Sequence, residues 1–313
     1  MSEIISAIIC THNRSAFLSK AINSLFNQSI SKSLYEILVI DNCSTDSTAE
    51  VVQKFSTGHK VRYVYEPRLG LSHARNTGWR NARGKYAAYL DDDAVADEVW
   101  LEKALEAFGK MTPMPGCVGG RVTGIWEAAR PKWLSDELLT GLTVLDWSNE
   151  PQQIHDLNQK WLAGANIAFS IEVMKQIGGF VPCLDRVGNN LLSGGDVFLQ
   201  KQIVKAGYSC IYYPDMAVKH HVPKTRLTQQ WFIPRYFWQG VSDAVAQIIE
   251  QAVSPAERLR LAIPFIIKLC RKPQTLLHLI LSSKNPGQFT RKCFAMITLG
   301  HILGLLYLAK PEK

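Results

Sequence analysis

The sequence predicts an α/β protein with a mostly parallel central sheet flanked by helices, followed by a helical C-terminal extension. In the first 90 residues, short apolar runs rich in Ile, Val and Tyr alternate with segments of helical apolar spacing. This alternation gives parallel strands joined by right-handed crossovers. After Arg226 the sequence turns helical and remains rich in apolar residues.

Four apolar runs each have the length of one buried strand. They lie at residues 4–9, 35–40, 61–65 and 85–90, with helical segments at residues 14–27, 46–55 and 71–82. Asp46 has the position of a helix N-cap. Open sheets of this type bind ligands beyond the carboxyl ends of their strands, and Asp41 and the aspartates at 91–93 follow two such ends.

The second half is less regular between residues 110 and 160, where Pro, Gly and Trp recur. Beyond it we expect a strand at 161–170, a short helix at 171–178, a helix at 197–206 and two short strands, "YSCIYYP" and "MAVKHHV". We expect one domain over residues 1–225, with a nucleotide-binding half at about 1–110 and an acceptor half at about 111–225. Residues 226–313 form the helical region.

Composition and cysteine usage indicate a globular, cytoplasmic protein. The chain has 313 residues, 47% of them hydrophobic and 20% charged, which excludes disorder. Its seven cysteines lie far apart without a C-x-x-C pair, as expected for reduced thiols. The opening "MSEIISAIIC" has no basic region before its apolar run, so we predict that it forms a strand rather than a secretion signal.

The net charge of +8 comes from the last third of the chain. Residues 219–313 hold 14 Lys and Arg against 4 Asp and Glu, whereas residues 1–218 hold 21 against 23. A basic region suits nucleic acid, anionic lipid or an acidic protein, and its apolar content favours lipid over nucleic acid. We therefore expect a peripheral protein on the inner face of the plasma membrane.

Residues 293–309 form an uncharged run of 17 residues. Three interpretations stay open: a short membrane span, an interfacial helix, or a helix packed on the protein's own core. Gly300, His301 and Gly304 favour the interfacial helix over the span.

The stretch "YLDDDAV" places Asp91, Asp92 and Asp93 directly after an apolar run. Three adjacent carboxylates are costly unless a cation or strong donors lie against them. Mg²⁺ and Mn²⁺ prefer such oxygen ligands and often share them with substrate phosphates. The alternative is that one aspartate caps the helix beginning near Asp97 while the others are solvated.

Two more segments suit a nucleotide. Asp41 begins a polar turn in "VIDNCSTDST", and Arg75 lies one turn into the helix that follows the glycine loop of "LGLSHARNTG". Neither the G-x-x-x-x-G-K-[ST] phosphate loop nor G-x-G-x-x-G after the first strand is present. The turn composition of Asp41 is also common without a ligand.

The ordered set of motifs resembles the family 2 glycosyltransferases, which have the GT-A fold. The resemblance spans residues 4 to about 240 and rests on "CTHNR", "VIDNCSTDST", "GLSHARNTG", "YLDDDAV", "LAGANIAF", "IGGF", "GGDVFLQKQIVKAGY" and "HHVPKTR". It implies a hexosyltransferase-type enzyme that takes its sugar from a nucleoside-diphosphate sugar, most commonly a UDP-sugar. A lipid-linked or polysaccharide acceptor is expected.

The resemblance also implies roles for individual residues. The donor nucleotide would be held by Thr11, Asn13, Arg14, Asp41, Arg75, Asp91 and Asp92. A divalent metal, Mn²⁺ or Mg²⁺, would be bound by Asp93, Asp91 and His220. Asp196 would be the catalytic base, and the donor-sugar and acceptor pocket would include Trp133, Gly164, Ala165, Asn166 and Gly195.

The implied chemistry is a direct displacement. The charge of the leaving diphosphate needs a cation, and the acceptor hydroxyl needs a base within hydrogen-bond reach. One base on the face opposite the leaving group implies inversion at the anomeric carbon.

Several departures and alternatives stay open. The family usually has Glu-Asp where this chain has Gly195 and Asp196, and Asp196 could instead be an N-cap. His220 and His221 could be solvated, and the tryptophans, Trp133 included, could be packed in the core. A sugar nucleotidyltransferase would need a glycine-rich loop after the first strand, which "CTHNRSA" lacks. A non-catalytic sugar-nucleotide-binding protein at the membrane is the remaining alternative.

Overall fold

The computed structural model describes residues 4–56, 61–186, 191–271 and 285–308. The chain divides into two compact units. The first, called the sheet unit, comprises Met1–Ile125, Thr143–Pro182 and Gly195–His221, and the second, called the C-terminal unit, comprises Trp126–Leu142, Cys183–Gly194 and Val222–Lys313. The C-terminal unit thus takes in two segments that precede residue 226. The expected domain limit near residue 225 stays a prediction.

The central sheet is mostly parallel, as predicted. Four parallel strands, β1 (Ile5–Thr11), β2 (Tyr35–Asp41), β3 (Val61–Tyr65) and β4 (Tyr86–Asp91), lie in the order β3-β2-β1-β4. The sheet continues through β9 (Asn166–Ser170), β6 (Cys117–Gly119), β10 (Cys210–Tyr212) and β8 (Gln152–Gln153). β9 pairs antiparallel with both β4 and β6. The strand predicted at 161–170 is therefore confirmed only from residue 166 onward.

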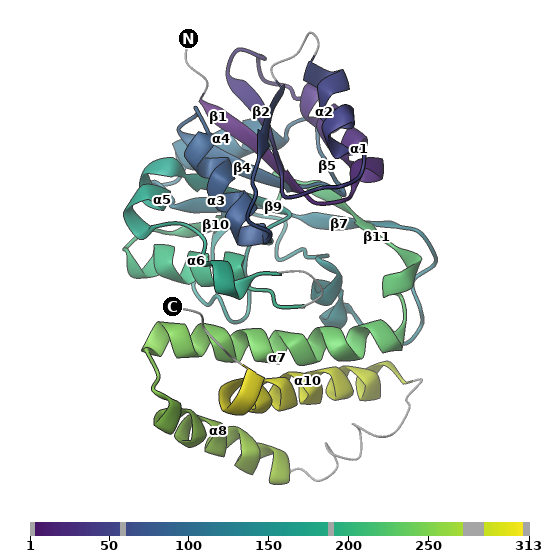
Figure 1. Ribbon diagram of the computed structural model, residues 1–313, viewed down its shortest axis with the longest axis vertical. Helices are drawn as coiled ribbons and strands as arrows, with labels where there is room; N and C mark the ends of the chain where they lie inside the picture. Colours follow the sequence, from purple (N-terminus) through teal and green to yellow (C-terminus); the bar gives the residue numbers. More distant parts are fainter. Residues whose placement is uncertain (1–3, 57–60, 187–190, 272–284, 309–313) are drawn as a thin grey trace. The chain divides into compact units, whose positions relative to one another are not determined.

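Side chains alternate between the two faces of the sheet because the strand period is two residues. Ile5, Ala7 and Ile9 of β1 belong to the core layer with α1 (Ser15–Phe26), α2 (Thr48–Ser56) and α4 (Trp100–Lys110). Ile8 belongs to the opposite layer with α3 (Leu71–Asn81), α5 (Ile171–Ile177) and α6 (Gly195–Lys205). Figure 1 shows these helices around the strands. The predicted helices are confirmed to within two residues at each end.

A second, three-stranded sheet has the order β5-β11-β7. It consists of β5 (Ala94–Ala96), β11 (Val218–Val222) and β7 (Val122–Trp126). His220 pairs with Ala94 in the antiparallel β5–β11 register. This pairing carries His220 to the end of β4, although the two segments are far apart in sequence.

The C-terminal unit contains the helices α7 (Gln229–Gln251), α8 (Pro255–Cys270) and α10 (Pro286–Leu303), which is followed by the π-helical turn Gly304–Leu308 (Figure 1). Short 3₁₀ segments lie at Asp136–Leu142, Pro182–Leu184 and Lys224–Arg226. The predicted helical C-terminal region is thus confirmed for the described residues.

Helices α7 and α10 approach each other closely at glycines. A Cβ on Gly240 would lie 1.9 Å from the Ile297 carbonyl oxygen, and one on Gly300 would lie 1.9 Å from the Phe237 carbonyl oxygen. Pro286–Leu308 is long and apolar enough to cross a bilayer, with a mean hydropathy of 1.3, and 44% of its most apolar window is buried. Core helices of soluble proteins can have the same length and hydropathy. The close contacts at Gly240 and Gly300 show that α10 packs against α7. Residue 309 of the predicted run lies outside the described residues.

Candidate active site

The parallel strands β1, β2 and β4 bring three acidic or polar segments to one edge of the sheet. Thr11 is level with Asp41 in the register of β1 and β2, and Cys10 is level with Asp91 in that of β1 and β4. Directly beyond this edge, the Thr11 hydroxyl donates to Asp92 Oδ2 at 2.8 Å. The carboxyl ends of the strands therefore meet as the sequence predicted.

Arg14 offsets the negative charge of Asp92 and Asp93, the two buried aspartates that follow Asp91. Its Nη2 lies 2.5 Å from Asp93 Oδ2, and its Nη1 lies 3.2 Å from Asp92 Oδ1. Burial, together with the neighbouring aspartates, raises the pKa of Asp92 to about 7 despite Arg14. Burial also raises the pKa of Asp93, but the adjacent His220 and Arg14 together hold the pKa of Asp93 well below its usual range.

The side chains of Asp91, Asp93 and His220 form a candidate metal centre. Each offers a ligand atom, and these atoms lie within 4.8 Å of one another. Asp93 Oδ1 is buried and has no hydrogen-bond partner among the residues that the structure describes, although His220 Nε2 lies 3.2 Å away. A buried carboxylate oxygen without a hydrogen-bond donor reduces the stability of the folded protein unless a cation lies next to it. Two carboxylates and an imidazole are ligands that divalent metal ions accept in proteins, so the residues present fit a divalent metal.

Asp91 also borders a second group that contains Arg75, Gly164 and Asp196. Arg75 Nη2 lies 4.0 Å from Asp91 Oδ1, and the guanidinium stacks 5.3 Å from the Phe180 ring centre. The Gly164 amide donates to Asp196 Oδ2 at 2.7 Å. A Cβ on Gly164 would lie 2.2 Å from Arg75 Nη2 and 3.0 Å from Asp196 Oδ2, so a larger residue here would displace the Arg75 guanidinium.

Asp196 lies in the first turn of α6, which begins at Gly195. Its Oδ1 accepts a hydrogen bond from the Val197 amide at 2.9 Å, and its Oδ2 is held by Gly164. The carboxylate is half-buried, which leaves it open to a ligand. Asp196 is thus the second residue of α6, one position inside the start of the helix, and its roles as base or as helix cap both stay predictions.

Asn13 joins the loop after β1 to the loop after β2, and Asp41 holds the loop after β2 against β3. Asn13 has a positive φ of 53°, and its Oδ1 accepts from the Thr45 amide at 2.7 Å. Asp41 Oδ1 accepts from the Ser44 amide at 2.9 Å, and Asp41 Oδ2 accepts from the Tyr63 hydroxyl at 2.7 Å. Both residues thus shape the loops that were predicted to hold the nucleotide.

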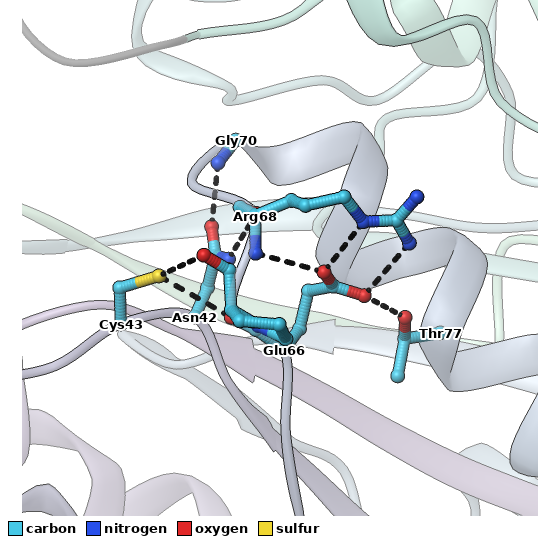
Figure 2. A network of polar contacts seen from close by, with 7 residues as sticks. Asn42, Cys43, Glu66, Arg68, Gly70 and Thr77 are labelled. Carbon is cyan, nitrogen blue, oxygen red and sulfur yellow. Dashed lines mark hydrogen bonds and ion pairs between the residues drawn. The ribbon is translucent and has the colours of Figure 1, made fainter.

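A polar network that the sequence did not predict fixes the next loop, between β3 and α3 (Figure 2). Asn42 donates to the Arg68 carbonyl oxygen at 2.8 Å and accepts from the Gly70 amide at 2.7 Å. Glu66 accepts from Arg68 Nε at 2.9 Å and also from the Thr77 hydroxyl. Together these bonds hold the start of α3, the helix that carries Arg75. In the sequence, the only signal for Asn42 is its place directly after Asp41 at the end of β2.

The remaining predicted pocket residues have other surroundings. Trp133 lies in the C-terminal unit, with its ring edge-to-face on Phe232 and Phe289. Asn166 is fully buried, and its amide donates to the carbonyl oxygens of Arg121 and Met216. Ala165 and Gly195 are also buried. The roles given to these residues stay predictions.

Comparison with known proteins gives the same family as the motifs. The sequence profile of "Glycosyl transferase family 2" matches residues 6–170. The chain is 28% identical over 219 residues to Glycosyltransferase AglE of Haloferax volcanii, covering 69% of this chain and 66% of that protein. It is 23% identical over 251 residues to a Glucosyl-dolichyl phosphate glucuronosyltransferase of the same organism, covering 78% of each.

Solved structures share the fold. The mannosyltransferase PcManGT from Pyrobaculum calidifontis, in complex with GDP-Man and Mn²⁺, superimposes with a TM-score of 0.63 at 19% identity, covering 98% of this chain and 88% of that one. The S. aureus TarS fragment 1–349 in complex with UDP superimposes with a TM-score of 0.55 at 14% identity, covering 96% and 90%. These likenesses confirm the GT-A fold. The profile match extends over more than half of the chain, and the protein belongs to glycosyl transferase family 2.

Proposed function

We propose that the protein is a metal-dependent, inverting glycosyltransferase that moves a sugar from a nucleoside-diphosphate sugar to a hydroxyl of a lipid-linked or polysaccharide acceptor. The observation that carries this proposal is the arrangement around Asp91, which faces a candidate metal centre on one side and the Arg75–Gly164–Asp196 group on the other. The candidate cation site and the group that contains the candidate base thus meet where Asp91 lies next to Arg75.

Asp91, Asp93 and His220 are the residues that would hold the divalent cation, which as a Lewis acid would offset the charge of the leaving diphosphate. Arg75 adds a fixed positive charge next to Asp91, and its side chain is 7% exposed. A buried guanidinium keeps its charge and suits phosphate oxygens. Arg14 contributes a second guanidinium at the neighbouring aspartates.

Asp196 is the proposed general base. The amides of Gly164 and Val197 fix its carboxylate, and each oxygen keeps a lone pair that can accept the proton of the acceptor hydroxyl. The bond from the acceptor oxygen to the anomeric carbon forms as the bond to the diphosphate oxygen breaks. Attack from the face opposite the diphosphate inverts the anomeric configuration.

The names of relatives and neighbours support the substrate classes. One relative is named for a glucosyl-dolichyl phosphate, which is a lipid-linked substrate, and neighbours were solved with GDP-Man or UDP. We infer a UDP- or GDP-sugar donor, and a place of action at the cytosolic face of the membrane where lipid-linked acceptors lie. The basic charge excess of residues 219–313 supports this location.

The test is Asp196→Asn, which keeps the size of the side chain and removes its basicity. Binding of the nucleoside diphosphate with Mn²⁺, measured by calorimetry, should be unchanged, while the transfer rate should fall by about 10²–10⁴-fold, the usual contribution of a general base. Asp215→Asn is the matched control because Asp215 is exposed in the loop between β10 and β11. Full transfer by Asp196→Asn would refute the assignment of the base, and retention of the anomeric configuration in the product would refute the inverting mechanism.

A further inference from the structure

Helix α8 exposes a continuous apolar face. Leu259, Ile263 and Ile267 follow one another at intervals of four residues, so they lie on the same side of the helix. Their exposed fractions are 57%, 45% and 43%. Cys270 is three residues further on and is exposed as well. Large aliphatic side chains in such a row usually have a partner.

The other side of α8 is packed within the C-terminal unit. Ala262 is fully buried, and the Phe265 ring lies 4.4 Å from that of His301, measured between ring centres. A capping box formed by Ser254 and Glu257 fixes the start of the helix. The apolar row is therefore the outward face of an anchored helix, and its exposure is not the result of a frayed end.

The charges beside this face favour an anionic lipid surface over a protein partner. Arg260 and Arg271 are exposed, and residues 219–313 carry 14 basic against 4 acidic side chains. A helix with an apolar face bordered by arginines binds in the headgroup region, with its apolar side chains toward the acyl chains. The long apolar helix α10, in contrast, uses Gly300 for its close contact with α7.

We propose that α8 is the membrane-binding surface of this protein and lies in the plane of an anionic bilayer. Leu259, Ile263 and Ile267 contact the acyl chains, while Arg260 and Arg271 contact lipid phosphates. The choice of a bilayer as partner rests on the proposed lipid-linked acceptor. The proposal differs from the expectation for residues 293–309, because it assigns the attachment to α8.

The first experiment compares binding to phosphatidylcholine vesicles that contain about one third phosphatidylglycerol. The triple variant Leu259→Gln, Ile263→Gln, Ile267→Gln keeps charge and helix propensity, and its partition coefficient should fall about 100-fold because three apolar side chains no longer enter the bilayer. Val204→Gln is the matched control, since Val204 is 42% exposed on helix α6. Its binding should equal that of the unaltered protein. Circular dichroism and the melting temperature check that each variant is folded.

Two further measurements separate the possible partners. Arg260→Gln with Arg271→Gln should weaken binding to these vesicles and leave the weaker binding to pure phosphatidylcholine unchanged. An environment-sensitive fluorophore on Cys270, the exposed cysteine, should shift to shorter wavelength when vesicles are added. The proposal is overturned if the triple variant binds vesicles as well as the unaltered protein, or if it only changes the oligomeric state in sedimentation, which would indicate a second copy on this face.

These outcomes are independent of catalysis. The triple variant should bind a nucleoside diphosphate with Mn²⁺ in solution as the unaltered protein does, because α8 belongs to the C-terminal unit and the candidate site to the sheet unit. Vesicle binding by the triple variant equal to that of the unaltered protein would therefore refute the role of α8 alone. Failure of the Asp196→Asn test would refute the assigned base alone.

Discussion

Gly164→Ala is the substitution for which the structure gives the clearest expectation. Gly164 lies between the proposed base and the arginine next to Asp91, and its φ is not in the left-handed region, so alanine meets no backbone penalty. The new Cβ would lie 2.2 Å from Arg75 Nη2 and 3.0 Å from Asp196 Oδ2. Ordinary contacts to a Cβ begin at about 3.4 Å. The guanidinium must therefore move by more than 1 Å.

A displacement of this size costs about 100-fold in rate when it affects groups that position the reaction. That factor corresponds to about 2.7 kcal/mol of activation free energy at 25 °C. The Gly164 amide stays in place, so its hydrogen bond to Asp196 is retained. We expect kcat to fall about 100-fold while the fold and its melting temperature change little.

The assay is release of nucleoside diphosphate from the donor sugar that gives the largest thermal shift with Mn²⁺. Gly109→Ala is the matched control, because a Cβ at this position in helix α4 would meet no atom within 4 Å. It should keep full activity and melt slightly higher, since alanine favours a helix by about 1 kcal/mol over glycine. Unaltered kcat in Gly164→Ala would refute the placement of Arg75 in the reaction.

Three further predictions concern stability. Gly240→Ala should destabilise the C-terminal helices by about 3 kcal/mol, because its Cβ would overlap the Ile297 carbonyl oxygen; a melting temperature within one degree of the original would contradict the glycine crossing. Asp46→Ala should cost about 1 kcal/mol in denaturant titration, since Asp46 Oδ1 caps α2 through the Thr48 amide at 3.1 Å, and an unchanged midpoint would show that the cap is dispensable. The pKa of Glu66 is held at about 2, mainly by its hydrogen bonds to Arg68, so its contribution is complete above pH 4.5 and is lost as the pH falls toward 2. Glu66→Gln should therefore lower the melting temperature at pH 6 and reduce its fall between pH 5 and pH 3; an identical pH profile would exclude this role.

The parallel strands of the fold could be predicted closely from the sequence. Buried strands of a doubly covered sheet are continuous apolar runs, and β1, β2, β3 and β4 begin and end within one or two residues of the predicted limits. The helices between them could be predicted because they carry regular apolar spacing. The short strand β5 spans only three residues, too few for any periodicity to be detected.

The site was predictable in its acidic part and less so in its surroundings. Adjacent aspartates after a strand are informative because their charge requires a partner. His220 reaches Asp93 only through the pairing of β5 with β11, which local spacing does not reveal, and its role was implied by family resemblance. Gly164 shows its importance only in three dimensions, where a side chain would displace the Arg75 guanidinium.

The C-terminal region shows where hydropathy alone is insufficient. The uncharged run near the end of the chain stands out because it is long and apolar, yet its glycines fit against α7. Average hydropathy does not reveal the exposed face of α8, because Arg258 and Arg260 lie in the same helix beside the apolar row. Which apolar side chains remain exposed depends on helix packing, and that requires the structure.

The central claim, that Asp91, Asp93 and His220 bind one divalent cation beside the donor diphosphate, is tested most directly by electron paramagnetic resonance of added Mn²⁺. With a nucleoside diphosphate present, the unaltered protein should bind one Mn²⁺ per chain. Asp93→Asn should weaken this binding by more than about 100-fold, because removing a direct metal ligand lowers the affinity more than removing a residue that only hydrogen-bonds to a ligand. Equal Mn²⁺ binding by Asp93→Asn and the unaltered protein would contradict the claim.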